Sequence, residues 1–295
     1  MGKINIGFLL SELSVMSYFS SDLLSETKRL LKLFNIKPKK SLSQSFVVSI
    51  NLIRDIIDLS AISPSDVVLE IGAGLGTLTQ FLAERAGKVI AIEVDSRLLK
   101  VLRWVLRDYD NVDLIHGDVL KIDFPLVDKV VSNLPFKISS PITFKLIEEP
   151  KFNFAVLTYQ REFADRLVAE PGTSQYGRLT VAASLFARVE LVRYASRFCF
   201  YPPPSVDVAV VKIYPKMKSL SDDERFLLEL LRYLFSQRNR KLRSPLLHYL
   251  VKVRNLSKGR SMRILSNIPY LEDRVRDLSP NQFLEVAKIV RRELM

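Results

Sequence analysis

Short β-branched segments alternate with helical segments along the first two thirds of the chain, and a glycine-rich turn joins the first such pair. Residues 67–71 form an apolar run between Pro64 and Gly72, and residues 88–93 form a second run. Between them, residues 77–85 carry apolar side chains at helical spacing. Buried strands that alternate with helices are typical of a parallel sheet covered by helices on both faces. The sequence therefore predicts a doubly wound α/β fold.

Later segments extend this pattern and then change it. Further strands are expected at residues 112–116, 127–132 and 154–159, and helices are expected after Asp95 and over residues 139–148. Residues 206–214 also alternate like a strand. Because they follow three consecutive prolines, we expect an antiparallel strand at the edge of the sheet. After Pro215 the pattern becomes helical, which predicts a small C-terminal helical domain.

Most of the positive charge lies in that C-terminal part. The chain has 44 Lys and Arg against 32 Asp and Glu, and residues 216–295 alone hold 18 basic and 9 acidic side chains. Residues 236–263 contain nine basic and no acidic residues. A polyanion is the expected partner, because each neutralised phosphate releases counterions. The alternative is a solvated basic surface. Apolar residues at the spacing of a helical core favour nucleic acid over a membrane surface.

The composition also limits compartment and metal chemistry. Cys199 is the only cysteine, so the chain can form neither an intramolecular disulfide nor a cysteine cluster for zinc. The apolar run at residues 4–10 is too short to span a bilayer, and no small-residue cleavage site follows it. We therefore expect a cytoplasmic protein without a membrane segment or a bound metal. A monomer is also expected, although composition does not bear on this point.

The glycine turn suggests a ligand site. Residues 70–76 read Glu-Ile-Gly-Ala-Gly-Leu-Gly, and Gly72 and Gly74 would let a ligand approach the backbone at the carboxyl edge of the sheet. The spacing differs from the GxGxxG of dinucleotide sites, and no triphosphate-binding lysine follows. Glu93 ends the next strand, where a carboxylate can accept hydrogen bonds from ribose hydroxyls. A nucleoside ligand is therefore predicted; a tight turn with a surface glutamate is the alternative.

Two later strands end in residues that suit adenine chemistry. Asp118 follows the third strand and can bind an adenine amino group, or cap a turn. The fourth strand ends in Asn133, Leu134, Pro135 and Phe136. The N6 amine of adenine is a poor nucleophile, because its lone pair is delocalised into the ring. The Asn133 oxygen and a backbone carbonyl held by Pro135 can accept its hydrogens and turn the lone pair toward an electrophile, while Phe136 stacks on an extruded base.

From about Lys28 to its end, the chain resembles the small-subunit rRNA adenine N6,N6-dimethyltransferase family, a branch of the S-adenosylmethionine-dependent methyltransferases. The family's glycine motif matches residues 70–76, and its catalytic Asn-Leu-Pro-aromatic motif matches residues 133–136. Other matching stretches are Tyr159-Gln-Arg-Glu, Tyr176-Gly-Arg-Leu-Thr-Val, Phe200-Tyr-Pro-Pro-Pro-Ser-Val-Asp and Phe235-Ser-Gln-Arg-Asn-Arg-Lys-Leu-Arg.

The resemblance implies a domain organisation and an activity. Residues 28–215 would form a Rossmann-like methyltransferase domain and residues 216–295 a basic helical RNA-binding domain, while residues 1–27 would be an extension without an assigned role. The enzyme would transfer methyl groups from S-adenosylmethionine to N6 of two adjacent adenines in the 3′-terminal hairpin loop of small-subunit rRNA, during ribosome biogenesis. Its partners would be that rRNA and the pre-ribosomal small subunit. The reaction needs no metal, because the sulfonium is already an activated methyl donor.

The resemblance also implies roles for individual residues. The catalytic group would comprise Asn133, Leu134, Pro135 and Phe136, and the RNA-binding group Arg238, Arg240, Lys241 and Arg243. The expected cofactor-binding residues are Ser45, Val47, Gly72, Gly74, Glu93, Asp118 and Asn133.

Two positions depart from the family pattern. Residues 43–47 read Ser-Gln-Ser-Phe-Val where the family has Gly-Gln-Asn-Phe-Leu, so the asparagine contact to the cofactor would be weakened, or replaced by the Ser45 hydroxyl. Phe136 stands where tyrosine is common, which keeps the stacking surface but removes a hydroxyl. Two other functions stay open: a large-subunit rRNA adenine methyltransferase, and a non-catalytic ribosome-assembly or nucleic-acid-binding factor on the same fold.

Overall fold

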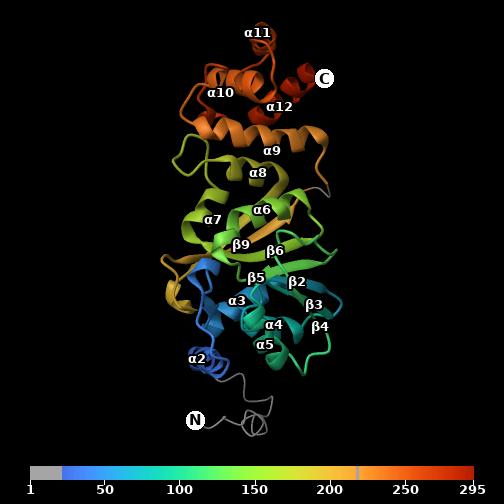
Figure 1. Ribbon diagram of the computed structural model, residues 1–295, viewed down its shortest axis with the longest axis vertical. Coiled ribbons are helices and arrows are strands. Elements are labelled where there is room, and N and C mark those ends of the chain that lie inside the picture. Colours follow the sequence, from blue (N-terminus) through green and yellow to red (C-terminus); the bar gives the residue numbers. More distant parts are fainter. Residues whose placement is uncertain (1–21, 217–218) are drawn as a thin grey trace.

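The computed structural model describes residues 22–216 and 219–295, and it places an α/β body beneath a group of C-terminal helices (Figure 1). Most of the predicted N-terminal extension, residues 1–21, lies outside the described residues. Its last residues belong to helix α2 (Leu23–Leu33), which Asp22 caps by accepting a hydrogen bond from the Ser25 backbone N–H.

A seven-stranded sheet forms the centre of the body, with strand order β4-β3-β2-β5-β6-β9-β7. Strands β2 to β6 are mutually parallel, and β9 runs antiparallel to both of its neighbours. The predicted doubly wound sheet is thereby confirmed. The strands are β2 (Val67–Ile71), β3 (Lys88–Glu93), β4 (Val112–His116), β5 (Lys129–Ser132), β6 (Phe154–Gln160), β7 (Ala187–Ala195) and β9 (Val208–Pro215).

The prediction for residues 206–214 was correct in direction but wrong in position. β9 is antiparallel, yet it lies between β6 and β7, and β7 forms the edge. The reason is burial, because residues 208–211 are all apolar and all buried, as a strand covered on both faces requires. Strand β7 was missed, although Arg188, Val189, Glu190 and Leu191 alternate in the manner of a half-exposed strand.

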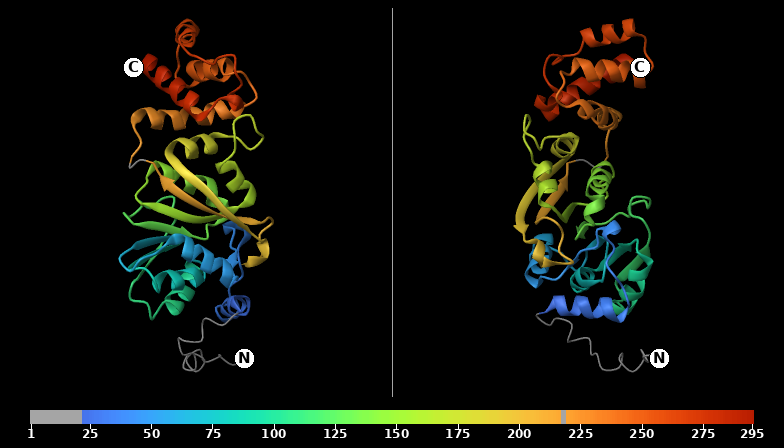
Figure 2. Two further views of the ribbon diagram at one scale, coloured as in Figure 1. Left: turned by 180° about the vertical axis from the view of Figure 1, so that it is seen from behind. Right: turned by 60° about the vertical axis from the view of Figure 1, so that its left-hand side comes forward.

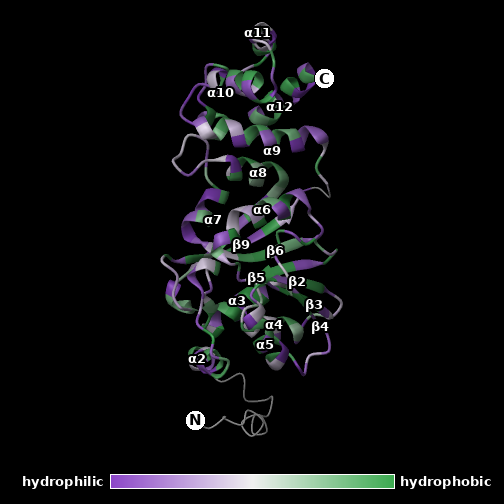
Figure 3. Ribbon diagram, in the orientation of Figure 1, coloured by the Kyte–Doolittle hydropathy of each residue, from purple (hydrophilic) through white to green (hydrophobic). Residues whose placement is uncertain are grey.

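Helices cover both faces of the sheet (Figure 2). Helices α3 (Ile50–Ser60), α4 (Thr77–Ala83) and α5 (Ser96–Val105) share one apolar cluster with α2, whereas α6 (Ser139–Glu148), α7 (Arg161–Leu167) and α8 (Arg178–Phe186) belong to the other. Neighbouring strand residues divide between the two clusters; Val68 belongs to one and Leu69 to the other. Hydrophobic residues accordingly run along the central strands (Figure 3).

The C-terminal helices pack directly on the α/β body. Leu227 of α9 and Phe283 of α12 belong to the same buried cluster as Leu179 of α8, and the Tyr176 hydroxyl donates to the Leu278 carbonyl at 2.7 Å. The predicted helical part therefore shares one core with the sheet. Its helices, all within the region predicted to be helical, are α9 (Asp222–Leu234), α10 (Arg243–His248), α11 (Lys258–Ser266) and α12 (Pro280–Leu294).

Short elements complete the fold. Two-residue strands β1 (Phe46–Val47) and β8 (Phe200–Tyr201) pair antiparallel outside the main sheet. Within residues 22–216 and 219–295, no helix is long and apolar enough to cross a bilayer. Short helical segments occur at Lys40–Leu42, Phe136–Ile138, Arg197–Cys199, Phe235–Gln237, Tyr249–Val253 and Val275–Asp277.

Candidate active site

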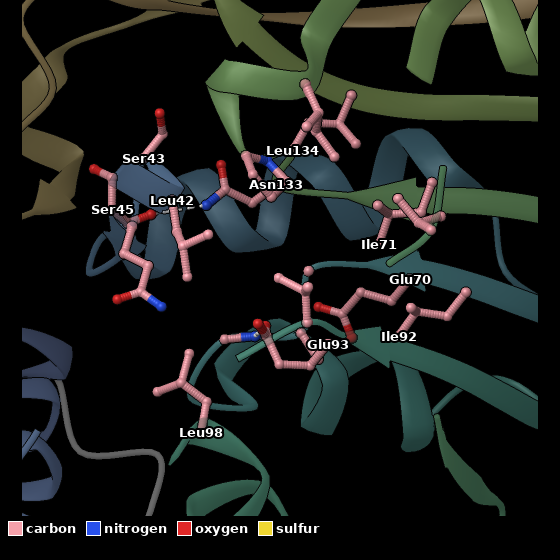
Figure 4. A pocket seen from close by; sticks show the side chains of 18 of the residues that line it. Leu42, Ser43, Ser45, Glu70, Ile71, Ile92, Glu93, Leu98, Asn133 and Leu134 are labelled. Atoms are coloured by element: carbon pink, nitrogen blue, oxygen red, sulfur yellow. Dashed lines mark hydrogen bonds between the residues drawn. The ribbon is translucent and has the colours of Figure 1, made fainter. Parts of the chain in front are cut away.

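A cavity of about 280 Å³ opens at the carboxyl ends of β2, β3 and β5. The strand order reverses between β2 and β5, and such switch points are where ligands bind in open α/β sheets. Figure 4 shows Asn133 and Ser45 on one wall of the cavity, with Glu93 across from them. All the residues predicted to bind the cofactor or to act in catalysis line this one cavity: Ser45, Val47, Gly72, Gly74, Glu93, Asp118, Asn133, Leu134, Pro135 and Phe136.

The glycine turn leaves no room for side chains. Gly72 has a φ of +79°, and a Cβ atom there would lie 2.8 Å from Cγ of Pro135. Gly74 has a φ of +62°, and its Cβ would lie 3.2 Å from the Phe46 ring. The turn is therefore held in a backbone conformation that favours glycine, between the catalytic segment on one side and the N-terminal segment on the other.

Glu93 ties the end of β3 to this turn. One carboxylate oxygen accepts from the Gly74 backbone N–H at 2.9 Å, and the other accepts from the Asp95 backbone N–H at 2.8 Å. Burial raises the pKa of Glu93, and these two hydrogen bonds offset part of that rise. Each carboxylate oxygen can accept a second hydrogen bond, so Glu93 suits a ligand that presents hydroxyl donors.

Asp118 stabilises a turn and also lines the cavity. One carboxylate oxygen accepts from the Leu120 backbone N–H at 3.0 Å and so fixes the turn after β4. The residue also lines the cavity, and its second oxygen makes no hydrogen bond within the described parts of the chain. That oxygen is available to accept a hydrogen bond from a ligand.

Asn133 is held on both sides of its amide. Nδ2 donates to the Ser45 carbonyl at 3.1 Å, and Oδ1 accepts from the Thr158 hydroxyl at 2.6 Å. The next residues follow as a packed unit: Leu134 is buried, Pro135 lies against Gly72, and the Phe136 ring meets Phe200 edge-on with 6.4 Å between centroids. Residues 133–136 are therefore held rigidly beside the glycine turn.

Residues 39–47 close the cavity from the N-terminal side. The Gln44 amide donates to Asp95 at 2.8 Å, and Lys137 donates to the Ser41 carbonyl at 3.0 Å. The Ser45 hydroxyl donates to the Pro202 carbonyl at 2.6 Å, so toward a cofactor it can act only as an acceptor. Hydrogen bonds from Arg97 and Gln44 hold the pKa of Asp95 well below its usual range.

Glu70 is a site residue that the sequence analysis treated only as part of the glycine motif. Its side chain lines the cavity, is 2% exposed, and has one carboxylate oxygen without a hydrogen-bond partner. Burial, together with the nearby Glu93 carboxylate, raises the pKa of Glu70 to about 8. A lone charged residue in the otherwise apolar run Val-Val-Leu-Glu-Ile was the available signal.

The predicted RNA-binding residues lie in the C-terminal helical part, beyond the sheet that carries the cavity (Figure 1). Arg238 donates to the carbonyls of Thr173 and Ser174, at 2.8 and 3.0 Å. Lys241 and Arg243 both pair with Glu272, at 2.9 and 3.2 Å. In contrast, the Arg240 side chain has no polar partner among the described residues.

Over the same residues, no three His, Cys, Asp or Glu side chains lie close enough together to hold a metal ion.

The family model for ribosomal RNA adenine dimethylase matches residues 35–292. The chain belongs to this family. Its members are enzymes that use S-adenosylmethionine as methyl donor, so the predicted family, enzyme class and cofactor are confirmed.

Individual rRNA adenine dimethylase relatives match over nearly their whole length. A protein of Methanosarcina mazei named "Probable ribosomal RNA small subunit methyltransferase A" is 41% identical, over 89% of this chain and 96% of the relative. A Thermococcus sibiricus protein of the same name is 42% identical, over 91% and 98%. Among solved structures, a dimethyladenosine transferase from Plasmodium falciparum has a TM-score of 0.71 and 34% identity, covering 84% of this chain and 98% of that one. The 23S rRNA methyltransferase ErmE has a TM-score of 0.59 and 26% identity, covering 83% and 99%.

Proposed function

We propose that this enzyme transfers methyl groups from S-adenosylmethionine to N6 of two adjacent adenines in the 3′-terminal hairpin loop of small-subunit rRNA, each adenine being methylated twice. The observation that carries the proposal is the position of Asn133, an amide acceptor that lines the same cavity as the Glu93 carboxylate and the glycine turn. An acceptor for an amine and an acceptor for ribose hydroxyls in one cavity suit a nucleoside cofactor beside an adenine base.

The cavity has donors and acceptors that fit this cofactor. Glu93 would accept hydrogen bonds from its ribose hydroxyls, and the free oxygen of Asp118 would accept from its adenine amino group. Gly72 and Gly74 would border it closely, because side chains are absent there. Ser45 and Val47 would face it from the N-terminal segment, and Asn133 would lie where cofactor and target base meet. When bound, the cofactor supplies an activated methyl group, so the chain's own work is alignment.

Asn133 would prepare the reacting amine. Its amide oxygen has one lone pair left after the hydrogen bond from Thr158, and that lone pair can accept an N6 hydrogen. The carbonyl that precedes Pro135 would accept the other hydrogen. Together they would turn the nitrogen lone pair out of conjugation with the ring, while Phe136 stacks on the base. The base must leave its stack to enter the cavity, which costs less in a loop than in a duplex.

Two features support small-subunit rRNA as the substrate. The proteins named for small-subunit methylation are 41–42% identical to this chain, whereas the 23S rRNA methyltransferase is 26% identical. The basic segment containing Arg238, Arg240, Lys241 and Arg243 supplies charge for RNA phosphates. We infer that the enzyme acts in the cytoplasm, as a monomer, on the rRNA of an assembling small subunit.

The test is to map the adenines that the enzyme labels. Wild type and Asn133→Ala would be incubated with labelled S-adenosylmethionine and unmethylated small subunits, large subunits or free rRNA. We expect label at paired adenines near the 3′ end of small-subunit rRNA with wild type, and only a small residual rate of labelling with Asn133→Ala. Label confined to large-subunit rRNA, or no label despite binding of cofactor and subunits, would contradict the proposal.

A matched control separates catalysis from folding. Asn111 also uses its amide to hold backbone, donating to the carbonyls of Ala83 and Ala86 at 2.8 and 3.0 Å, but it does not line the cavity. Asn111→Ala should therefore lose stability while it keeps its methylation pattern. RNA binding by Asn133→Ala should stay close to that of wild type, since the basic residues are unchanged.

A further inference from the structure

A buried hydroxyl lies directly behind Asn133. Thr158 belongs to β6, is 0% exposed, and pairs through its backbone with Val210 of β9. The parallel register of β5 and β6 places Ser132 opposite Leu157, so the following residues, Asn133 and Thr158, are neighbours. Among the described residues the Thr158 hydroxyl has one hydrogen-bond partner, Oδ1 of Asn133 at 2.6 Å.

The partners of Asn133 fix which way its amide faces. The Ser45 carbonyl can only accept, so it must face the Nδ2 hydrogens, as the 3.1 Å contact shows. The amide oxygen can only accept, so the Thr158 hydroxyl must be the donor in the second contact. Ser45 is itself held, because its hydroxyl donates to the Pro202 carbonyl. The Ser45 carbonyl therefore sets the orientation of the amide, and the Thr158 hydroxyl, which can donate or accept, donates to the oxygen end and holds it in place.

We propose that Thr158 is a positioning residue for methyl transfer, because its hydroxyl anchors the Asn133 amide oxygen, in the orientation that the Ser45 carbonyl sets, where the reacting amine can donate to it. This inference rests on the proposed function, in which Asn133 accepts a hydrogen from adenine N6. Without this hydrogen bond the amide oxygen could move away from the reacting amine, although the Ser45 carbonyl would still hold the nitrogen end. The amine would then lose a fixed acceptor for one of its hydrogens, so the reaction would slow while the binding surfaces stayed in place.

The chain offers a matched site that separates positioning from packing. Thr143 on α6 is also 0% exposed, and its hydroxyl bonds to Tyr159 at 2.8 Å and to the Ser139 carbonyl at 2.6 Å. It makes no hydrogen bond to Asn133. Thr→Val replaces the hydroxyl by a methyl group of similar size, so both variants lose a buried hydroxyl and its hydrogen bonds. Only at Thr158 does it free the catalytic amide.

The experiment uses the full chain with unmethylated small subunits and S-adenosylmethionine. It compares wild type with Thr158→Val, Thr158→Ser and Thr143→Val for kcat, both KM values and Tm. One lost hydrogen bond at the reacting amine corresponds to about a tenfold fall in kcat for Thr158→Val, with each KM changed less than about twofold. Thr158→Ser should restore most of kcat. Thr143→Val should lower Tm to a similar degree as Thr158→Val while it keeps kcat.

A double variant tests whether Thr158 acts through Asn133. Adding Thr158→Val to Asn133→Ala should cause no further loss of single-turnover rate, because the amide that Thr158 anchors is already absent. Three results would overturn the inference: wild-type kcat in Thr158→Val, no recovery in Thr158→Ser, or a full additional loss in the double variant. Absence of small-subunit label with wild type would instead overturn the proposed function, and this inference with it.

Discussion

Gly72 is the residue at which the glycine turn meets residues 133–136, the proposed catalytic segment. An alanine Cβ there would have to occupy space 2.8 Å from the Pro135 ring, at a φ of +79° that side chains rarely adopt. Gly72→Ala should therefore cost at least about 1 kcal/mol of stability, because the glycine turn and residues 133–136 must move apart. For the same reason it should weaken cofactor binding about tenfold or more. Calorimetric titration with S-adenosylmethionine and thermal melting would measure both effects.

Gly259 supplies the comparison for that substitution. It lies in α11, where an added Cβ would meet no atom within 4 Å and the backbone is helical. Alanine is the better helix former, so Gly259→Ala should raise stability slightly and leave cofactor binding unchanged. Equal loss of affinity in the two variants would show that the crowding at Pro135 has no bearing on the cofactor.

Glu70 makes stability depend on pH in a direction opposite to that of most carboxylates. Its pKa is about 8 in the folded chain, against 4.5 as the ordinary value. Between these values the folded state binds more protons than the unfolded state, so the free energy of unfolding falls as pH rises. The contribution is fully present below pH 4.5 and is lost as pH rises to about 8.

Glu70→Gln removes that dependence, because glutamine does not ionise. Relative to wild type without cofactor, the variant should gain stability from about pH 5 to pH 8, by up to about 1.4 kcal/mol for each pH unit. Denaturant titrations at the two pH values would measure the gain. Glu190→Gln, which changes an exposed carboxylate on β7, should follow wild type at both. A stability difference between Glu70→Gln and wild type that stays constant over this range would refute the assignment of a raised pKa.

At the scale of elements, the sequence predicted the strands and helices that have regularly spaced apolar residues and glycine or proline residues at their ends. Strands β2, β3 and β4 begin and end at the predicted residues, and α6 covers residues 139–148 as expected. Because parallel strands end at one edge, the residues after β2, β3, β4 and β5 were expected to share a site, and they line one cavity. Strand β7 was missed, since charged residues interrupt its apolar positions, and helices α3, α7 and α8 were not predicted either.

The contacts that complete the site could not be predicted in this way. Asn133 and Ser45 are 88 residues apart in sequence, and Gln44 and Asp95 are 51 apart. Their meeting depends on how β1 and residues 39–45 cross the carboxyl edge of the sheet, and neither hydrophobic period nor a turn residue specifies that path. Thr158 lay within a predicted strand, but an apolar-looking strand gives no sign that one hydroxyl faces a catalytic amide.

At the scale of the whole molecule, the parts to which we assign chemistry and RNA recognition share a core. The buried cluster on one face of the sheet continues without a break into α9 and α12. The Tyr176 hydroxyl also joins the loop before α8 to the Leu278 carbonyl, before α12. A shared core fixes the basic helical part relative to the cavity. The enzyme can therefore hold an RNA backbone at one place and admit a base at another without a flexible linker between them.

The individual cations of the basic segment should then contribute unequally to RNA affinity. Hydrogen bonds from Lys241 and Arg243 lower the pKa of Glu272, so both cations are already partly neutralised, whereas Arg240 has no polar partner among the described residues. Arg240→Ala should therefore weaken RNA binding more than Lys241→Ala does. It should also reduce the slope of log affinity against log salt by about 0.7 to 0.9, as expected for one lost phosphate contact.

Filter binding to small-subunit rRNA over a range of salt concentrations would measure these slopes. Lys100→Ala removes the same charge from an exposed position on α5, in the α/β body, and should leave the slope unchanged. If all three variants reduce the slope equally, RNA affinity depends on the net charge of the protein and not on the position of the basic segment. A selective loss in Arg240→Ala would instead place a phosphate at that side chain, because only a local contact distinguishes one exposed cation from another.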